Sequence, residues 1–135
     1  MRATRFLIYL WVFPTTLVGV PLLLGSLFSG GRARCINGVL EVHGGLAEFY
    51  LRRIVGLVLQ GGASAMTLGH IVIGLNPEAL ETTRSHERVH VRQCECWGPF
   101  FIPAYLLASA FQWARGRRAY RDNPFERQAY EQDCE

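Results

Sequence analysis

The chain is 135 residues long, which is enough for one compact domain with a short appendage and too short for a multidomain enzyme. Half of its residues are hydrophobic, 19% are charged, and the formal net charge is +3. All fourteen basic residues are arginines, scattered and without interleaved aromatic residues, which argues against a nucleic-acid partner. The four cysteines include no CxxC pair, so we expect neither a zinc ribbon nor a disulfide framework.

The first element is an uncharged apolar run over residues 6–28, which has about the length needed to cross a bilayer. Pro14 and Pro21 lie inside it and are tolerated better in a membrane helix than in a soluble one. A cleaved signal peptide is the alternative, but the run is longer than an ordinary signal core and no A-x-A cleavage site follows it. We therefore expect residues 1–30 to form an uncleaved anchor in contact with lipid. Arginines flank both ends, so the orientation stays open.

Residues 31–135 would form one domain that begins with a β-hairpin. Asn37 and Gly38 lie between β-favouring residues, and this pair is typical of a tight hairpin turn because both tolerate positive φ. The apolar residues of the segment 46–55 are spaced as in a short amphipathic helix.

Residues 54–75 contain no charged side chain, as would be expected of a second membrane span. They contain five glycines together with Gln60 and His70, a composition that favours strand and turn over a membrane helix. We expect residues 65–74, AMTLGHIVIG, to form a single strand directly before the next helix, with the membrane span as the alternative.

Residues 85–90, SHERVH, contain an HExxH motif, and Asn76 followed by Pro77 predicts the start of the helix that carries it. On a helix, His86 and His90 lie one turn apart on one face, where two imidazoles can share a Zn²⁺ ion. Glu87 would lie beside the metal, placed to polarise water. A surface helix that carries two histidines by chance is the alternative. The opposite helix face, which we expect to face solvent, carries Arg84, Arg88, Arg92 and Glu95.

Gly98 and Pro99 end this helix, and the apolar run over residues 100–114 is too short for a comfortable membrane span. We expect this run to form a buried core helix, a re-entrant membrane segment or a helix that lies in the membrane interface. The aromatic residues that bracket it, as at a headgroup boundary, are Trp97, Tyr105 and Trp113. The arginines that follow, suited to anionic headgroups or to a helix C-terminus, are Arg115, Arg117, Arg118 and Arg121. Asn123 and Pro124 predict the start of a final helix.

A catalytic zinc site needs a third protein ligand and an open position for water. A short final helix could bring Glu126 back to the metal; its alternative role is a capping box with the backbone N–H of Asn123. Glu87 would act as general base, taking a proton from water and delivering it to the leaving amine. For Cys94, a buried free thiol is the better interpretation. The other downstream ligand candidates are Glu95, Glu131, Asp133, Cys96 and Cys134. The candidates for an oxyanion partner, which the sequence does not rank, are Tyr120, Tyr130 and His70.

The block HERVHVRQ, preceded by AMTLGHIVIG and followed by WGPFFIPAYL and YRDNPFERQAY, resembles the zincin metallopeptidases. It is most similar to compact gluzincin-like forms whose third ligand is a glutamate on a later helix, and to small bacterial membrane proteins of unassigned function. The resemblance implies that zinc is held by His86, His90 and Glu126, and that Glu87 is the base. It also implies that the strand before the helix is an edge on which an extended peptide could pair, through Thr67, Gly69 and Ile71.

Together these patterns predict an α+β fold in which an N-terminal transmembrane helix precedes a small zincin-like domain. That domain would hold a short β-sheet, the HExxH helix and C-terminal helices. The predicted function is a membrane-anchored zinc metallopeptidase of the bacterial inner membrane, which hydrolyses peptide substrates with zinc-activated water and a glutamate base. The alternative is a non-catalytic accessory subunit, bound to a membrane-protein partner in a larger complex, with a structural or vestigial metal site.

Overall fold

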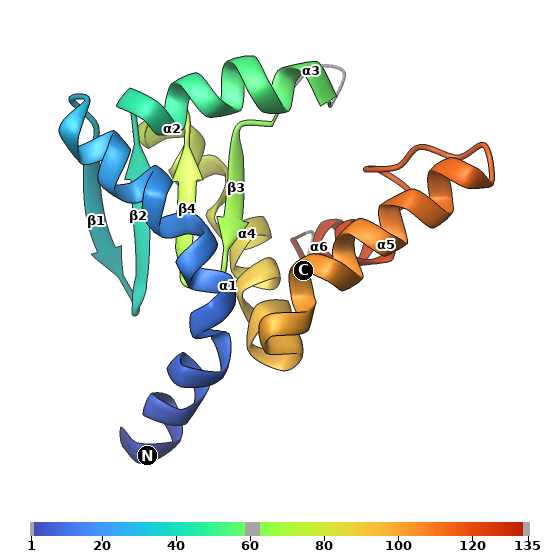
Figure 1. Cartoon of the computed structure of the whole chain (residues 1–135), viewed down its shortest axis with the longest axis horizontal. Coiled ribbons are helices and arrows are strands. Elements are labelled where there is room, and N and C mark those ends of the chain that lie inside the picture. The colour runs from blue at the N-terminus through green and yellow to red at the C-terminus, as the bar shows by residue number, and fades with distance from the viewer. Residues whose placement is uncertain (1, 59–62, 134–135) are drawn as a thin grey trace.

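A four-stranded β-sheet forms the centre of the fold and carries helices on both of its faces (Figure 1). The computed structural model describes residues 2–58 and 63–133, and it confirms an α+β fold with an N-terminal apolar helix and C-terminal helices. The longer helices are α1 (Arg2–Phe28), α4 (Pro77–Trp97), α5 (Phe101–Ala114) and α6 (Pro124–Asp133). The shorter helical segments are α2 (Gly45–Phe49), the π-helix η1 (Tyr50–Val55), α3 (Gly56–Val58) and the 3-10 turn η2 (Gly98–Phe100).

The sheet combines two hairpins that meet through a parallel pair of strands. Its strands are β1 (Arg32–Ile36), β2 (Val39–His43), β3 (Ala65–Leu68) and β4 (Ile71–Gly74). They lie in the order β1-β2-β4-β3, with β2 and β4 parallel and both outer pairs antiparallel. The predicted first hairpin is confirmed, because Asn37 at φ 52° and Gly38 at φ 80° turn the chain between β1 and β2.

The single strand predicted over residues 65–74 is wrong, because this segment forms the hairpin β3–β4. Gly69, at φ 66°, and His70 turn the chain between the two strands. A hydrophobicity pattern misses this turn, since the residues on both sides of it are equally apolar. Ile71 consequently lies in β4, between β2 and β3, and Gly69 lies in the turn. Of the three residues predicted to form a substrate-pairing edge, only Thr67 lies on an outer strand.

Each face of the sheet has its own apolar core, because successive side chains of a strand point to opposite faces. The core under α4 consists of Val39, Ala65, Val72, Leu80 and Val91. The core under α1, α2 and η1 consists of Val42, Ala47, Leu51, Val55, Ile71 and Ile73. The amphipathic helix predicted over residues 46–55 is confirmed as α2 and η1, which supply three residues of the second core. The alternative of a membrane span over residues 54–75 is contradicted for residues 65–74, which lie in the sheet; residues 59–62 lie outside the described residues.

Helix α1 packs one side against the sheet and leaves its other side exposed. The Thr16 hydroxyl accepts a hydrogen bond from the backbone N–H of His70 at 3.2 Å, and Thr15 Oγ1 donates to the carbonyl of Gly98 at 2.7 Å. Gly19 allows close approach, since a Cβ added there would lie 3.0 Å from the Cβ of Leu68. Among the described residues, α1 is the one helix long and apolar enough to cross a membrane by length and composition.

The helices that carry the HExxH motif and Glu126 start where the sequence predicts. Asn76 caps α4 by accepting a hydrogen bond from a first-turn backbone N–H at 2.7 Å, and Gly98, at φ 56°, follows its end. Asn123 caps α6 by accepting a hydrogen bond from the backbone N–H of Phe125 at 2.9 Å. The fully buried side chain of Asn123 also donates to the carbonyl of Tyr105 at 3.0 Å, which fastens the start of α6 to α5.

Only part of the arginine face of α4 faces solvent as expected: Arg92 is exposed, whereas Arg84 and Arg88 are partly buried over the sheet. Arg84 Nε donates to Oε1 of the buried Glu41 on β2 at 3.0 Å, and Arg88 Nη2 donates to the carbonyl of Ile36 at 3.0 Å. The sequence pattern could not show this, because it does not reveal that a strand with an inward-pointing glutamate lies under this face of the helix.

Candidate metal centre

Two histidines of α4 and one glutamate of α6 meet in the buried space between these helices. His86 Nε2 lies 3.2 Å from Glu126 Oε2, and His90 Nε2 lies 3.2 Å from Glu126 Oε1. One ligand atom from each residue lies within 4.8 Å of the other two, and none of the three residues is more than 7% exposed. The structure therefore brings the three predicted ligands together in a group that can hold a metal ion.

The spacing of this group fits a small divalent cation. In a tetrahedral site with metal–ligand bonds of about 2.0–2.1 Å, neighbouring ligand atoms lie about 3.3 Å apart. Each histidine nitrogen lies 3.2 Å from a different oxygen of Glu126, so each nitrogen–oxygen pair taken by itself has this spacing. Two imidazoles and a carboxylate suit Zn²⁺ among other transition metals, and they leave a fourth position open for water.

Gln93 orients His90 from the next turn of α4. The Nδ1 atom of His90 lies 2.8 Å from Gln93 Oε1, which can only accept, so Nδ1 donates a hydrogen there, and Nε2, which faces Glu126, is the nitrogen that would bind a metal ion. Gln93 Nε2 donates to the carbonyl of Phe125 at 3.0 Å and to Gln128 Oε1 at 2.7 Å, which fixes the direction of the amide. Gln93 thus fixes the orientation of the His90 ring and joins α4 to α6.

Tyr105 on α5 is a site residue that the sequence did not reveal. Its hydroxyl donates to Glu126 Oε1 at 2.7 Å, instead of lying at a headgroup boundary as expected. Burial by itself would raise the pKa of Glu126, but hydrogen bonds from His86 and His90 outweigh it, and the pKa falls to about 2. The Glu126 carboxylate is therefore charged and held from three sides, as a metal ligand should be.

Glu87 lies beside this group and is held by the outer strand of the sheet. Thr67 Oγ1 donates to Glu87 Oε2 at 2.6 Å, so a residue predicted to pair with substrate instead orients the predicted base. Burial raises the pKa of Glu87, and the neighbouring His90 and the Thr67 hydroxyl only partly oppose that rise. A raised pKa makes this carboxylate a better proton acceptor near neutral pH.

Two of the three oxyanion candidates lie at the site and one does not. The ring of Tyr130 lies 4.6 Å from that of His86, and Tyr120 hydrogen-bonds to Tyr130. Burial raises the pKa of Tyr120, so its hydroxyl keeps its proton and can donate. His70 lies on another side of α4, where its Nε2 is 3.0 Å from Glu95 Oε1, and this places it away from an oxyanion role.

The other described ligand candidates do not join this group, since Glu95 pairs with His70 and both Cys96 and Glu131 are exposed. Cys94 lies in an apolar cluster with Val12 and Phe101, where burial raises its thiol pKa to about 12. Glu126 does not form the capping box considered as its alternative, because the backbone N–H of Asn123 donates to the carbonyl of Tyr120 instead. The side chain of Asp133 and the whole of Cys134 lie outside the described residues.

The arrangement has the parts that metal-assisted hydrolysis needs: a metal-binding triad, a buried carboxylate beside it and tyrosine hydroxyls within the site. Comparison of the chain with protein-family models, curated proteins and solved structures finds no match.

Proposed function

We propose that this chain is a membrane-anchored zinc metallopeptidase with a compact, gluzincin-like site. The observation that carries the proposal is the meeting of His86, His90 and Glu126 with Glu87 beside them. The resemblance of the HExxH block to zincins supports zinc as the ion, since the same two-histidine, one-glutamate donor set is typical of catalytic zinc sites.

The residues around the triad have separate roles in peptide hydrolysis. Zinc, when bound, would polarise the scissile carbonyl and make water more acidic. The carboxylate of Glu87, oriented by Thr67, accepts a proton from the attacking water and passes it to the nitrogen of the leaving amine. The hydroxyls of Tyr120 and Tyr130 are the groups in the site that can donate to the developing oxyanion.

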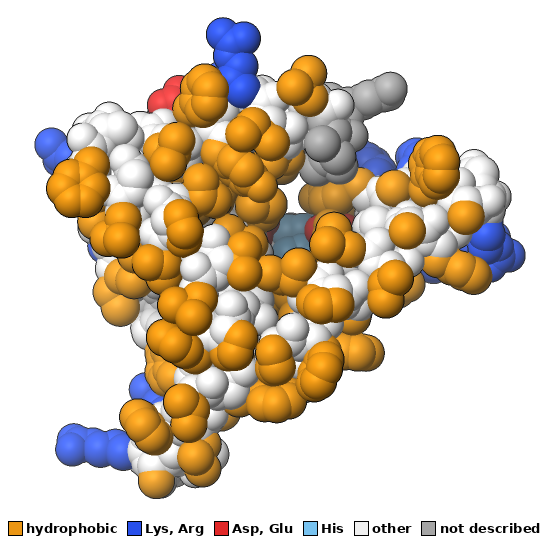
Figure 2. All heavy atoms as spheres, in the orientation of Figure 1, with side chains coloured by type: hydrophobic (Ala, Val, Ile, Leu, Met, Phe, Trp, Pro, Cys, Tyr) orange, Lys and Arg blue, Asp and Glu red, His pale blue; other side chains and the backbone are white. Residues whose placement is uncertain are grey.

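The exposed surface supports attachment to a membrane. Hydrophobic side chains of α1, α5 and the α2–α3 segment gather on one face, and arginines lie around its periphery (Figure 2). Apolar surface bordered by cations matches a bilayer, which offers acyl chains inside and phosphates at the boundary. The exposed large hydrophobic residues of these elements include Phe6, Leu7, Phe28, Leu57, Leu106, Leu107, Phe111 and Trp113.

The same face supports a substrate presented at the membrane. It is hollowed between β3 and α5, and histidine and acidic side chains show at the floor of the hollow (Figures 1 and 2). Because β3 is an outer strand, an extended peptide that enters the hollow has backbone groups with which to pair. The substrate class that fits is an extended segment of a membrane-bound or membrane-associated polypeptide.

Glu87→Gln tests the proposal, since it keeps the shape of the side chain and removes the proton acceptor. The full chain would be placed in lipid nanodiscs, loaded with zinc and incubated with a library of apolar and extended peptides. We expect Glu87→Gln to retain zinc and to lose about 10²–10⁴ in cleavage rate.

The matched control is Glu81→Gln, an exposed glutamate on the same helix, which should leave the rate unchanged. Equal activity of the wild type and Glu87→Gln, with zinc confirmed in both, would reject the peptidase proposal and favour the accessory subunit.

A further inference from the structure

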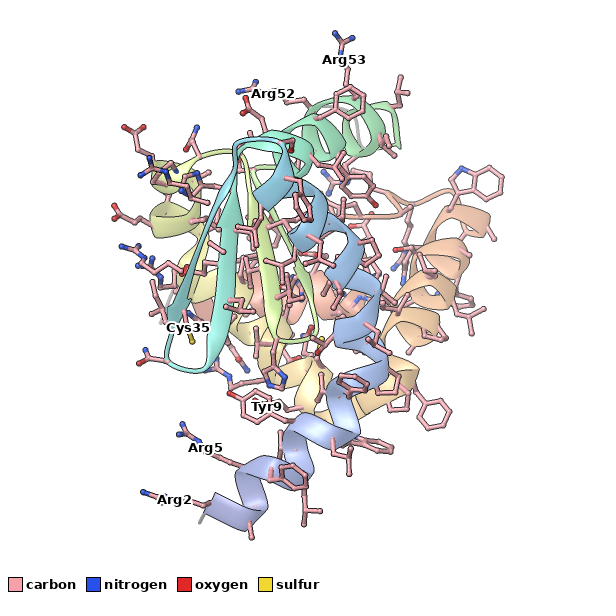
Figure 3. All side chains as sticks on the ribbon, turned by 60° about the vertical axis from the view of Figure 1, so that its left-hand side comes forward. Arg2, Arg5, Tyr9, Cys35, Arg52 and Arg53 are labelled. Atoms are coloured by element: carbon pink, nitrogen blue, oxygen red, sulfur yellow. The ribbon has the colours of Figure 1, made fainter. Side chains whose placement is uncertain are left out.

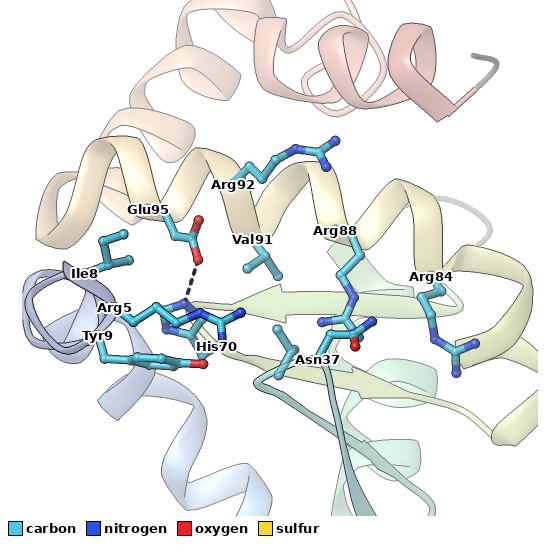
Figure 4. Close-up of a pocket in the computed structure, with 11 residues that line it drawn as sticks. Arg5, Ile8, Tyr9, Asn37, His70, Arg84, Arg88, Val91, Arg92 and Glu95 are labelled. Atoms are coloured by element: carbon cyan, nitrogen blue, oxygen red, sulfur yellow. Dashed lines mark hydrogen bonds and ion pairs between the residues drawn. The ribbon is translucent and has the colours of Figure 1, made fainter. Parts of the chain in front are cut away.

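A cavity of about 390 Å³ lies between the start of α1, the two hairpin turns and the arginine face of α4. Figure 3 shows Arg5 and Tyr9 of α1 on this side of the molecule, near the β1–β2 hairpin with Cys35. Four arginines line the cavity, namely Arg84, Arg88 and Arg92 of α4 and Arg5 of α1 (Figure 4). The end of the Arg92 side chain points away from the others, and its Nη2 donates to Gln132 Oε1 at 3.4 Å. The metal centre uses none of these side chains.

Contacts between α1, the β1–β2 turn, the β3–β4 turn and α4 tie the walls of the cavity together. The Tyr9 hydroxyl donates to the carbonyl of Gly38 at 2.8 Å, which joins α1 to the β1–β2 turn. The Tyr9 ring lies 4.3 Å from the ring of His70, and His70 pairs with Glu95 of α4 at 3.0 Å. These contacts form a fixed frame, so the cavity does not depend on one mobile loop.

Two arginines that line this cavity each have a buried guanidinium nitrogen that finds no hydrogen-bond partner among the described residues. These nitrogens are Nη2 of Arg84 and Nη1 of Arg88, whose other atoms contact Glu41 and the carbonyl of Ile36. An unpaired buried donor on a charged group costs free energy, and water or an anion usually accounts for it. The lining favours the anion, because it holds four arginines and one carboxylate, that of Glu95, which pairs with His70. Glu41 and Glu81 offset part of the charge of Arg84 and Arg88 from outside the lining.

We propose that this cavity binds a phosphate-bearing anion between the arginines of α4 and Arg5 of α1. The planar fork of a guanidinium matches two phosphate oxygens, and several such forks around one pocket are typical of phosphate recognition. Arg5 precedes the apolar part of α1, so a bilayer that holds α1 places the cavity at the level of the headgroups. The phosphate can therefore belong to a lipid headgroup or to a free ion.

Binding would be measured on the full chain in phosphate-free detergent, with inorganic phosphate titrated by calorimetry. A second arm uses nanodiscs of phosphatidylcholine with and without phosphatidic acid, followed by native mass spectrometry of the lipids that stay bound. Saturable binding of inorganic phosphate supports the free ion as source. Retention of phosphatidic acid that free phosphate does not displace supports the headgroup.

The double variant Arg5→Gln, Arg92→Gln should weaken binding about tenfold or more, since it removes two forks without leaving Glu41 unpaired. The charge-matched control is Arg53→Gln, Arg117→Gln, two exposed arginines outside the cavity, which should bind as the wild type does. Arg88→Lys keeps a cation beside Glu41 but lacks the fork, and should also bind more weakly.

Absence of binding in both arms overturns the proposal. Equal weakening in the cavity and control double variants does so as well, because it shows attraction by net charge alone. Unchanged phosphate affinity in both the cavity double variant and Arg88→Lys would also overturn the proposal.

Discussion

Glu126 shows how single residues prepare this site for a cation. Its carboxylate lies within hydrogen-bond distance of His86, His90 and Tyr105, and its depressed pKa keeps it charged. Buried charge is costly unless it is paired, so these contacts fix both the position and the charge of the ligand. The residues that hold the ligands matter as much as the ligands themselves.

Gln93→Ala tests that view at the residue scale. The variant removes the acceptor for His90 Nδ1 and the links to Phe125 and Gln128, so the imidazole loses its fixed direction. We expect zinc affinity to fall about 10–100-fold with the fold retained, as measured by competition with a chromophoric chelator. The control Gln132→Ala, an exposed residue of α6, should bind as the wild type does. Unchanged affinity in Gln93→Ala would show that this glutamine serves only to join the helices.

The sequence predicted which three residues meet in the candidate metal centre but not the residues that support them, and the difference has a physical cause. His86 and His90 are local to one helix, so their spacing alone places them on one face. Glu126 was predicted as the third ligand from the helix start at Asn123 and from the resemblance of the HExxH block to zincins. The contacts of Tyr105 and Thr67 depend on how α5 and β3 pack, which no local pattern contains.

At the scale of the elements, α6 is the helix that completes the metal centre, and its start is held more firmly than that of α4. Asn123 is fully buried and bonds to the backbone of Phe125, to the carbonyl of Tyr105 and to Ser109 Oγ. Asn76 makes a single exposed cap bond. The two asparagines therefore occupy the same cap position in their helices with different surroundings.

Asn123→Ala should lower the free energy of unfolding by about 2–4 kcal/mol, because it loses the cap and leaves buried partners unpaired. Asn76→Ala should lower it by about 1 kcal/mol, the usual value for a cap alone. Denaturant unfolding of both variants in the same detergent gives the comparison. Equal losses would contradict a structural link between α5 and α6 through Asn123.

Element boundaries were predicted well wherever a side chain caps or breaks the chain, as at Asn76, Gly98 and Asn123. The β3–β4 hairpin was missed because its turn holds one glycine in an otherwise apolar stretch. The sequence also gave no sign that Arg84 would lie over the buried Glu41, since that pair joins residues far apart in the chain.

At the scale of the whole molecule, the apolar face joins α1, α5 and the α2–α3 segment into one surface (Figure 2). The proposed membrane contact therefore extends beyond the N-terminal helix. Trp113 on α5 is 74% exposed and is a natural probe of that contact.

In vesicles with brominated lipids, we expect the fluorescence of Trp113 to be quenched in a variant whose other tryptophans are changed by Trp11→Phe and Trp97→Phe. Bromine quenches only nearby indoles, so quenching reports contact with acyl chains. Aqueous acrylamide should quench the same residue weakly. The reverse pattern would show that the outer face of α5 lies in water or is covered by another protein.

The metal centre is the central claim, and metal content measures it most directly. Full-length protein, purified in detergent without chelators, would be analysed by elemental mass spectrometry beside His90→Ala and Glu126→Ala. We predict one zinc ion per chain in the wild type, none retained in His90→Ala and strongly reduced zinc in Glu126→Ala, because two ligands hold the ion poorly. Wild-type protein without zinc, or Glu126→Ala with full occupancy, would contradict a centre built from these three side chains.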